Sequence, residues 1–149
     1  MLTFLLAVDG SVSSLKAAEK TSELTKFHES KVSILTVLDI SKIELSELQS
    51  YRPEESLDKL IEKNEGDMNK KGKQILNDAA EYFKGKNTEI KKIIKYGDAA
   101  DVICDYAEEK KFDFIILADK GLSGVKRFFL GSISDKVVRH AKSSVIIVK

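Results

Sequence analysis

The residues best suited to hold a ligand are glycines and serines near the end of the chain. Gly121 and Gly124 follow an apolar run, and Gly131 and Ser132 directly precede a helical segment. Glycine lets a backbone approach a ligand closely, and the free N–H groups and dipole at a helix start favour an anion, so these residues predict phosphate binding. They also fit a structural role, in which Gly131 turns the chain and Ser132 caps the helix, with Asp135 completing a capping box. The two roles are compatible, because one capping oxygen satisfies only part of the free donors.

A carboxylate at the end of the first apolar run is the second candidate group. Asp9 stands in the segment Val-Asp-Gly-Ser. If this run is a strand beside the one that precedes Gly121, Asp9 faces the same crevice. There it can accept hydrogen bonds from ribose hydroxyls or from metal-bound water. Its alternative role is to cap the first helix together with Ser11, and both roles can hold at once.

The elements that must position these residues alternate along the chain. Five β-rich apolar runs predict strands at Thr3–Val8, Val32–Leu38, Thr88–Tyr96, Asp113–Ala118 and Ser144–Val148. The segments between them predict helices at Ser14–Phe27, Ser56–Lys84, Ala99–Lys110 and Ser134–Ala141. Several of the runs are continuously apolar, as strands covered by helices on both faces require. We therefore predict an α/β fold, a doubly wound five-stranded parallel sheet of order 3-2-1-4-5 that binds its ligand at the carboxyl strand ends.

Length and composition fit one soluble, cytoplasmic domain over residues 1–149. The 25 Lys and Arg residues nearly balance the 24 Asp and Glu residues, for a net charge of +1. No basic field therefore predicts a nucleic acid or an anionic membrane as partner. Cys104 is the only cysteine, which excludes an intramolecular disulfide and fits a reducing cytosol. The opening run lacks a basic leader, and no stretch approaches the ~18 apolar residues of a membrane helix.

Residues for catalysis and metal binding are not apparent. No Gly-x-Gly-x-x-Gly follows the first strand, and no P-loop of correct spacing is present. His28 and His140 are too isolated to pair on a metal, and Cys104 has no histidine near it in sequence. We predict no catalytic residue and no metal ligand set, and at most slow hydrolysis of a bound nucleotide.

Several longer segments resemble the universal stress protein family. They are Val-Asp-Gly-Ser after the first strand, Leu-Thr-Val-Leu-Asp at the end of the second, Tyr-Gly-Asp before the third helix, and the long block from Gly121 to Ala141 followed by Ser-Val-Ile-Ile-Val. The resemblance spans the whole chain and implies an adenine nucleotide alpha hydrolase-like fold. Family members that bind ATP carry Gly-x2-Gly-x9-Gly-Ser or Thr, which is matched here at Gly121, Gly131 and Ser132, with Ala118 in place of the first glycine.

The resemblance also implies how such a site is divided, with ATP, with or without Mg²⁺, as the cofactor. It places Ala7, Val8 and Asp9 along the adenosine, Val37 at the adenine, Leu117 and Ala118 under the ribose, and Gly121, Gly131, Ser132, Ile133 and Ser134 around the phosphates. Asp119 also belongs to this site. Its carboxylate repels a triphosphate unless a metal ion intervenes or Lys120 offsets the charge.

These features predict a nucleotide-binding stress-response or signalling module that acts through conformational or partner control. The apolar, nearly uncharged run at residues 144–148 is an expected edge strand, and such an edge usually finds a partner. The resemblance implies a homodimer in which two copies of this strand pair antiparallel. Two alternatives remain: a nucleotide-independent dimeric scaffold, which Ala118 and Asp119 favour, and a weak ATPase. Other protein partners are not identified by the sequence.

Overall fold

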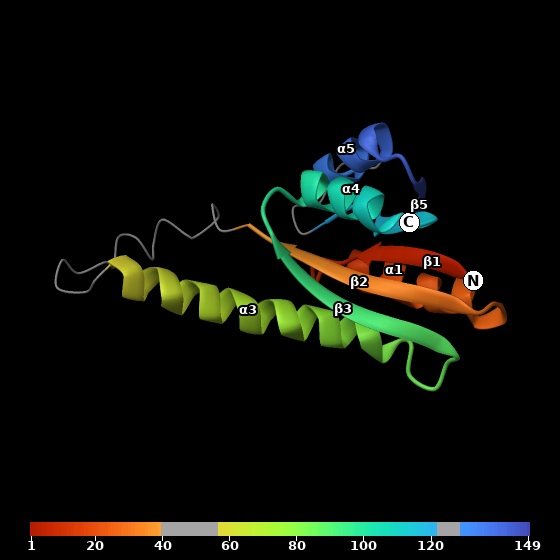
Figure 1. Cartoon of the computed structure of the whole chain (residues 1–149), viewed down its shortest axis with the longest axis horizontal. Helices are drawn as coiled ribbons and strands as arrows, with labels where there is room; N and C mark the ends of the chain where they lie inside the picture. The colour runs from red at the N-terminus through yellow and green to blue at the C-terminus, as the bar shows by residue number, and fades with distance from the viewer. Residues whose placement is uncertain (40–56, 122–128) are drawn as a thin grey trace.

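A computed structural model describes residues 1–39, 57–121 and 129–149 of the chain (Figure 1). The elements are β1 (Leu2–Ala7), α1 (Val12–Leu24), the 3-10 turn η1 (Thr25–Phe27), β2 (Ser30–Leu38), α3 (Leu57–Glu81), β3 (Thr88–Tyr96), α4 (Ala99–Lys110), β4 (Phe114–Ala118), α5 (Ser132–His140) and β5 (Ser144–Val148). The five predicted strands are all present, each with its ends within two residues of those expected. The strand and helix alternation read from the sequence is therefore confirmed.

The sheet has the predicted order, β3-β2-β1-β4-β5. All four strand pairs are parallel. The central strand β1 pairs with β2 on one side and with β4 on the other, and its residues Leu5 and Leu6 are fully buried. Because the chain order reverses between β1 and β4, the carboxyl ends of these two strands border the crevice in which such folds bind ligands.

Helices cover both faces of the sheet, which explains the continuous apolar runs. One hydrophobic core lies between the sheet and helices α1 and α3 and includes Phe4 and Leu6. A second lies on the opposite face, between the sheet and helices α4 and α5, and includes Leu5 and Ile115. In Figure 1, α4 and α5 lie above the sheet and α3 lies below it, with the N-terminal half of α3 extending past the carboxyl ends of β2 and β3. Successive residues of one strand thus feed opposite cores.

Two glycines let α3 lie close to the carboxyl end of the sheet. A Cβ atom on Gly72 would stand 3.2 Å from side-chain atoms of both Leu38 and Ile94. Gly10 has a φ of +84°, and a Cβ atom there would meet Ile75 of α3 at 2.9 Å. The helix is therefore packed directly against the turn that follows β1, and this contact helps to fix the position of the turn.

The capping-box prediction at α5 is wrong. The helix begins at Ser132, two residues earlier than expected, and Gly131 occupies the N-cap position without a side-chain hydrogen bond. The Gly131 carbonyl accepts from the Asp135 N–H at 2.8 Å, while its own N–H donates to the Asp119 carbonyl at 2.7 Å. This tertiary bond fixes Gly131 where a cap would stand, so Ser132 becomes the first helical residue. The predicted cap of α1 is confirmed, because Ser11 Oγ accepts from the Ser14 N–H at 3.1 Å.

The start of the predicted helix Ser56–Lys84 can be followed only in part. Residues 40–56 lie outside the described part of the chain, and α3 begins at Leu57. Among the residues that the structure describes, no helix has the length and apolar character needed to cross a membrane.

Candidate functional site

Two loops meet at the carboxyl ends of β1 and β4. Asp9 Oδ1 accepts from the Ser11 N–H at 2.9 Å, which holds the carboxylate in the turn after β1. Asp9 Oδ2 lies 2.7 Å from the position that a Cβ atom on Gly121 would occupy. A side chain at position 121 would therefore displace the carboxylate. The requirement for glycine here comes from close approach of the two loops.

The start of α5 is docked against the same loop. A Cβ atom on Gly131 would lie 3.3 Å from the Asp119 carbonyl oxygen, 3.6 Å from Lys120 Cα and 3.7 Å from the Gly121 nitrogen. Gly131 is itself buried. The two glycines predicted to hold phosphate thus lie side by side, one in the loop after β4 and one at the N-terminus of α5. Gly124, the other glycine of this segment, lies outside the described residues.

The first turn of α5 offers backbone donors to an anion. No hydrogen bond among the described residues uses the N–H groups of Ser132, Ile133 or Ser134. The Ser134 hydroxyl donates to the Ala118 carbonyl at 2.7 Å, and this buried bond fastens the helix to β4. Ser134 can therefore offer an anion its N–H group, because its hydroxyl proton is already used. Free N–H groups at a helix start, supported by the helix dipole, form a site suited to a phosphate.

Alanine fits without strain at the position where the ATP-binding pattern has its first glycine. Among the described non-glycine residues only Lys111 has a positive φ, so Ala118 has an ordinary strand backbone. Its side chain is buried in the core cluster on the α1 and α3 face. The next residue, Asp119, donates its N–H to the Val148 carbonyl at 3.0 Å. The backbone at this end of β4 is therefore held in place from both sides.

The remaining predicted site residues line the same edge of the sheet through their backbones. Val8 and Leu117 are buried core side chains, so a ligand would meet mainly their main-chain groups. Ala7 pairs with Leu35 of β2, and the Val8 N–H donates to the Leu35 carbonyl at 2.9 Å. Val37 is half-buried near the end of β2, one strand away from Asp9 on the side opposite β4.

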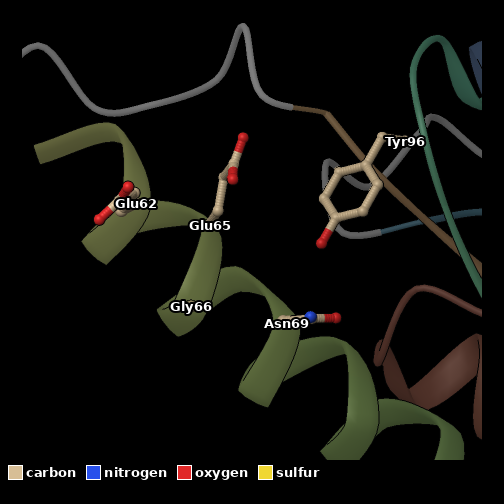
Figure 2. A pocket seen from close by; sticks show the side chains of 5 residues that line it. All are labelled: Glu62, Glu65, Gly66, Asn69 and Tyr96. Atoms are coloured by element: carbon tan, nitrogen blue, oxygen red, sulfur yellow. The ribbon is translucent and has the colours of Figure 1, made fainter. Parts of the chain in front are cut away.

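A pocket that the sequence did not indicate lies beside this edge. It has a volume of about 330 Å³ and is lined by Glu62, Glu65, Gly66, Asn69 and Tyr96. Figure 2 shows the α3 side chains on one wall and the Tyr96 ring, from the end of β3, on the other. Nothing in the sequence could assign these α3 residues to a site, because their position depends on how α3 crosses the sheet.

The thiol of Cys104 is not suited to nucleophilic chemistry. Burial, together with the nearby carboxylates of Asp105 and Asp101, raises the pKa of Cys104, which keeps the thiol protonated at neutral pH. Within the described ranges, His, Cys, Asp and Glu side chains do not gather in groups of three or more that would hold a metal ion.

Comparison with known proteins gives a consistent result. The model of the universal stress protein family matches residues 1–149. Universal stress protein YxiE of Bacillus subtilis (strain 168) is 34% identical over 147 residues, which is 97% of each chain. The similarity therefore extends over both the sheet and the candidate site.

Solved structures share the fold at lower identity. Universal stress protein UspA from Lactobacillus plantarum superposes with a TM-score of 0.80 at 23% identity, covering 99% of this chain and 97% of that one. A universal stress protein family protein from Arabidopsis thaliana, solved with AMP bound, has a TM-score of 0.66 at 22% identity and covers 100% and 92% of the two chains. Further similar structures are of universal stress proteins in complex with cAMP and, from Archaeoglobus fulgidus, with dAMP.

Proposed function

The chain belongs to the universal stress protein family, and from this premise we propose that it is a cytoplasmic, ATP-binding module in stress response or signalling. The observation that carries the proposal is the set of N–H groups at the start of α5 that have no partner among the described residues, held beside Gly121 and Gly131 and across from Asp9. Backbone donors at a helix start suit a polyphosphate, and a carboxylate at the end of β1 suits ribose hydroxyls.

The proposed nucleotide crosses the carboxyl ends of the strands. Its phosphates lie at α5, its ribose at Asp9 and its base toward Val37 on β2. Relatives solved with AMP, cAMP and dAMP support the adenosine half of this arrangement. A triphosphate also brings negative charge close to Asp119, so Mg²⁺ carried by the nucleotide, or Lys120, has to offset that repulsion.

Signalling through bound nucleotide follows from where the ligand would lie. It would contact the turn after β1, the loop after β4 and the first turn of α5 together, so its presence favours one arrangement of these segments. A partner that recognises this arrangement would then distinguish the loaded from the empty protein. Since the sequence offers no catalytic constellation, we expect hydrolysis to be slow at most.

Mass spectrometry of small molecules released from denatured, freshly purified protein is the first test. We expect ATP or ADP near one per chain. Calorimetry with ATP and Mg²⁺, then with AMP, should show tighter binding of ATP, because only ATP reaches the α5 donors with its terminal phosphates. Empty protein that gives no heat with either nucleotide would replace the proposal with the nucleotide-independent scaffold.

The second part of the proposal is a homodimer through the outer edge of β5. This edge strand lies at the end of the sheet, and a groove of about 490 Å³ beside it is lined partly by Leu24, Phe27 and Ile147. Leu24 is 50% exposed and Phe27 is 78% exposed. A second copy that paired antiparallel with β5 would satisfy the open edge and cover these apolar side chains.

Light scattering at micromolar concentration tests the dimer. We expect the wild-type protein to have twice the monomer mass and Phe27→Asp to shift toward monomer. Phe27 is so exposed that the variant should keep its fold, which a thermal melt checks. A wild-type monomer, or a variant as dimeric as the wild type, would contradict this interface.

A further inference from the structure

The strand β3 forms the outer edge of the sheet opposite β5 (Figure 1). It pairs with β2 alone, over the nine consecutive residues Thr88–Tyr96. The Gly97 N–H donates to the Leu38 carbonyl, so the backbone groups of odd-numbered β3 residues face β2 and those of even-numbered residues face outward. The outward N–H and C=O groups of β3 therefore have no strand partner in the described part of the chain.

This edge lacks several of the usual protections against pairing with another strand. Proteins often keep an edge strand very short, or interrupt it with a bulge or a proline. The strand β3 has nine residues, keeps one register with β2 throughout and contains no proline. It carries charge instead, in Lys91, Lys92 and Lys95. Lysines oppose pairing with a basic strand, but they leave the edge open to an acidic one.

The lysines and the isoleucines of β3 are ordered by face. Ile93 packs against the core on the α4 and α5 side, whereas Ile90 and Ile94 pack against the core on the α1 and α3 side. Because side chains alternate along a strand, Lys91 and Lys95 flank Ile93 on the α4 side. Lys91 is exposed, and the other two are half-buried. This face of the edge therefore presents a cation, an apolar group and a second cation in a row.

The positive charge of this face is not cancelled by the acidic side chains beside it. Lys91 forms no ion pair with any of the described residues. Lys95 Nζ lies 4.7 Å from the centre of the Tyr106 ring, a cation–π contact that leaves its charge in place. The neighbouring carboxylates each have another lysine: Glu89 pairs with Lys31 at 2.9 Å, and Glu109 pairs with Lys110 at 2.6 Å. The face thus keeps an excess of positive charge.

From these observations we infer that the β3 edge is a docking surface for an extended, acidic segment of another protein, which adds a strand to the sheet. Its residues opposite Lys91, Ile93 and Lys95 would point to the same face, so the matching segment reads acidic-x-apolar-x-acidic. A second copy of this chain does not fit, because antiparallel pairing of two β3 strands about Ile93 sets Lys91 of one copy against Lys95 of the other. The surface is separate from the crevice and from β5, so this inference goes beyond the proposed function and does not depend on nucleotide binding.

Fluorescence anisotropy of the full chain with the labelled peptide Thr-Glu-Thr-Val-Thr-Glu-Thr tests the side-chain part of the inference. We expect this peptide to bind, and a peptide with lysine in place of both glutamates to bind about tenfold more weakly. Lys91→Glu should weaken the glutamate peptide about fivefold, and the joint variant Lys91→Glu, Lys95→Glu about 25-fold. The joint variant should prefer the lysine peptide. The control variant Lys70→Glu, Lys73→Glu makes the same change in net charge on exposed residues of α3 and should change neither affinity.

Backbone pairing has a separate readout in the peptide. An added strand presents only alternate N–H groups to β3, so N-methylation of one alternate set should abolish binding and that of the other set should leave it nearly unchanged. Equal binding of both N-methylated peptides would overturn strand addition. Failure of the wild-type chain to bind the glutamate peptide, or equal affinity in the joint variant when a thermal melt shows it folded, would overturn the docking surface. Peptide binding by a chain that binds no nucleotide would retain this inference and remove the proposed function.

Discussion

The paired strands β1 and β4 differ between their two ends in how their hydrogen-bonding groups are satisfied. At the amino end, Asp113 Oδ2 accepts from the Thr3 N–H at 2.8 Å and from the Thr3 hydroxyl at 2.7 Å, and the Asp113 N–H donates to the Thr3 carbonyl at 3.1 Å. At the carboxyl end, glycines let the two loops approach closely and leave the first N–H groups of α5 without partners in the described chain. One end is closed by its own side chains and the other has free donors.

This difference separates stability from binding. Backbone groups need hydrogen-bond partners, and where the protein supplies none, water or a ligand must do so. The amino end therefore contributes to the fold, whereas the carboxyl end would gain its missing partners if it bound an anion, as we propose. Substitutions at the two ends should accordingly have different effects, and the following predictions are ordered from the largest effect to the smallest.

Replacing Gly131 by valine should have the largest effect on binding. A Cβ atom at this position lies only 3.3 Å from the Asp119 carbonyl oxygen, and the two additional methyl groups have to displace the loop or the start of α5. We expect ATP affinity to fall about 100-fold, as loss of one or two hydrogen bonds to a charged group predicts. Calorimetry measures the loss, and a thermal melt confirms that the variant is folded. Unchanged affinity in a folded variant would show that the α5 donors do not hold the phosphates.

Gly121→Ala should have a smaller effect at the same end. Its Cβ atom would stand 2.7 Å from Asp9 Oδ2, so the carboxylate has to rotate or move while the rest of the loop can stay in place. We expect ATP to bind about tenfold more weakly, the cost of roughly one hydrogen bond. The control ligand is 2′,3′-dideoxy-ATP, which lacks the hydroxyls that Asp9 is proposed to bind. If Gly121→Ala lowers the affinity for this analogue as much as the affinity for ATP, a role of Asp9 at the ribose is contradicted.

The sheet could be predicted from the sequence, because its strands have a local apolar pattern. The details of the site could be predicted only in part, because they depend on tertiary contacts. Continuous apolar runs such as Phe114–Ala118 identify buried parallel strands from local composition alone. The predicted strand order was one of the common orders of a doubly wound sheet, and the structure confirms it. The start of α5 was misplaced because Ser132 and Asp135 form a local pattern that resembles a capping box. The start of the helix is instead determined by the hydrogen bond from the Gly131 N–H to the Asp119 carbonyl. A tertiary contact of this kind leaves no local pattern in the sequence.

Two further contacts between elements also could not be predicted from local sequence patterns. The Ser134 hydroxyl bonds to the Ala118 carbonyl, a partner outside its own helix. The α3 wall of the pocket depends on the crossing of α3 over β2 and β3, which Gly72 makes possible. Both features follow from packing between elements, whereas periodicity describes each element singly.

Asp113→Ala tests the amino end and should have the smallest effect, confined to stability. Hydrogen bonds from the Thr3 N–H, then from its hydroxyl, lower the pKa of Asp113 from its ordinary value of 3.8. Because the folded-state pKa is the lower one, the ionised carboxylate stabilises the fold above pH 3.8, and this contribution is lost as the pH falls through the folded-state pKa. The variant should therefore have a slightly lower melting temperature than the wild-type protein at pH 7, and this difference should disappear in acid, while its ATP affinity stays unchanged. A difference in melting temperature that persists in acid would attribute the effect to packing. Weaker ATP binding would show that the two ends of the β1–β4 pair are coupled.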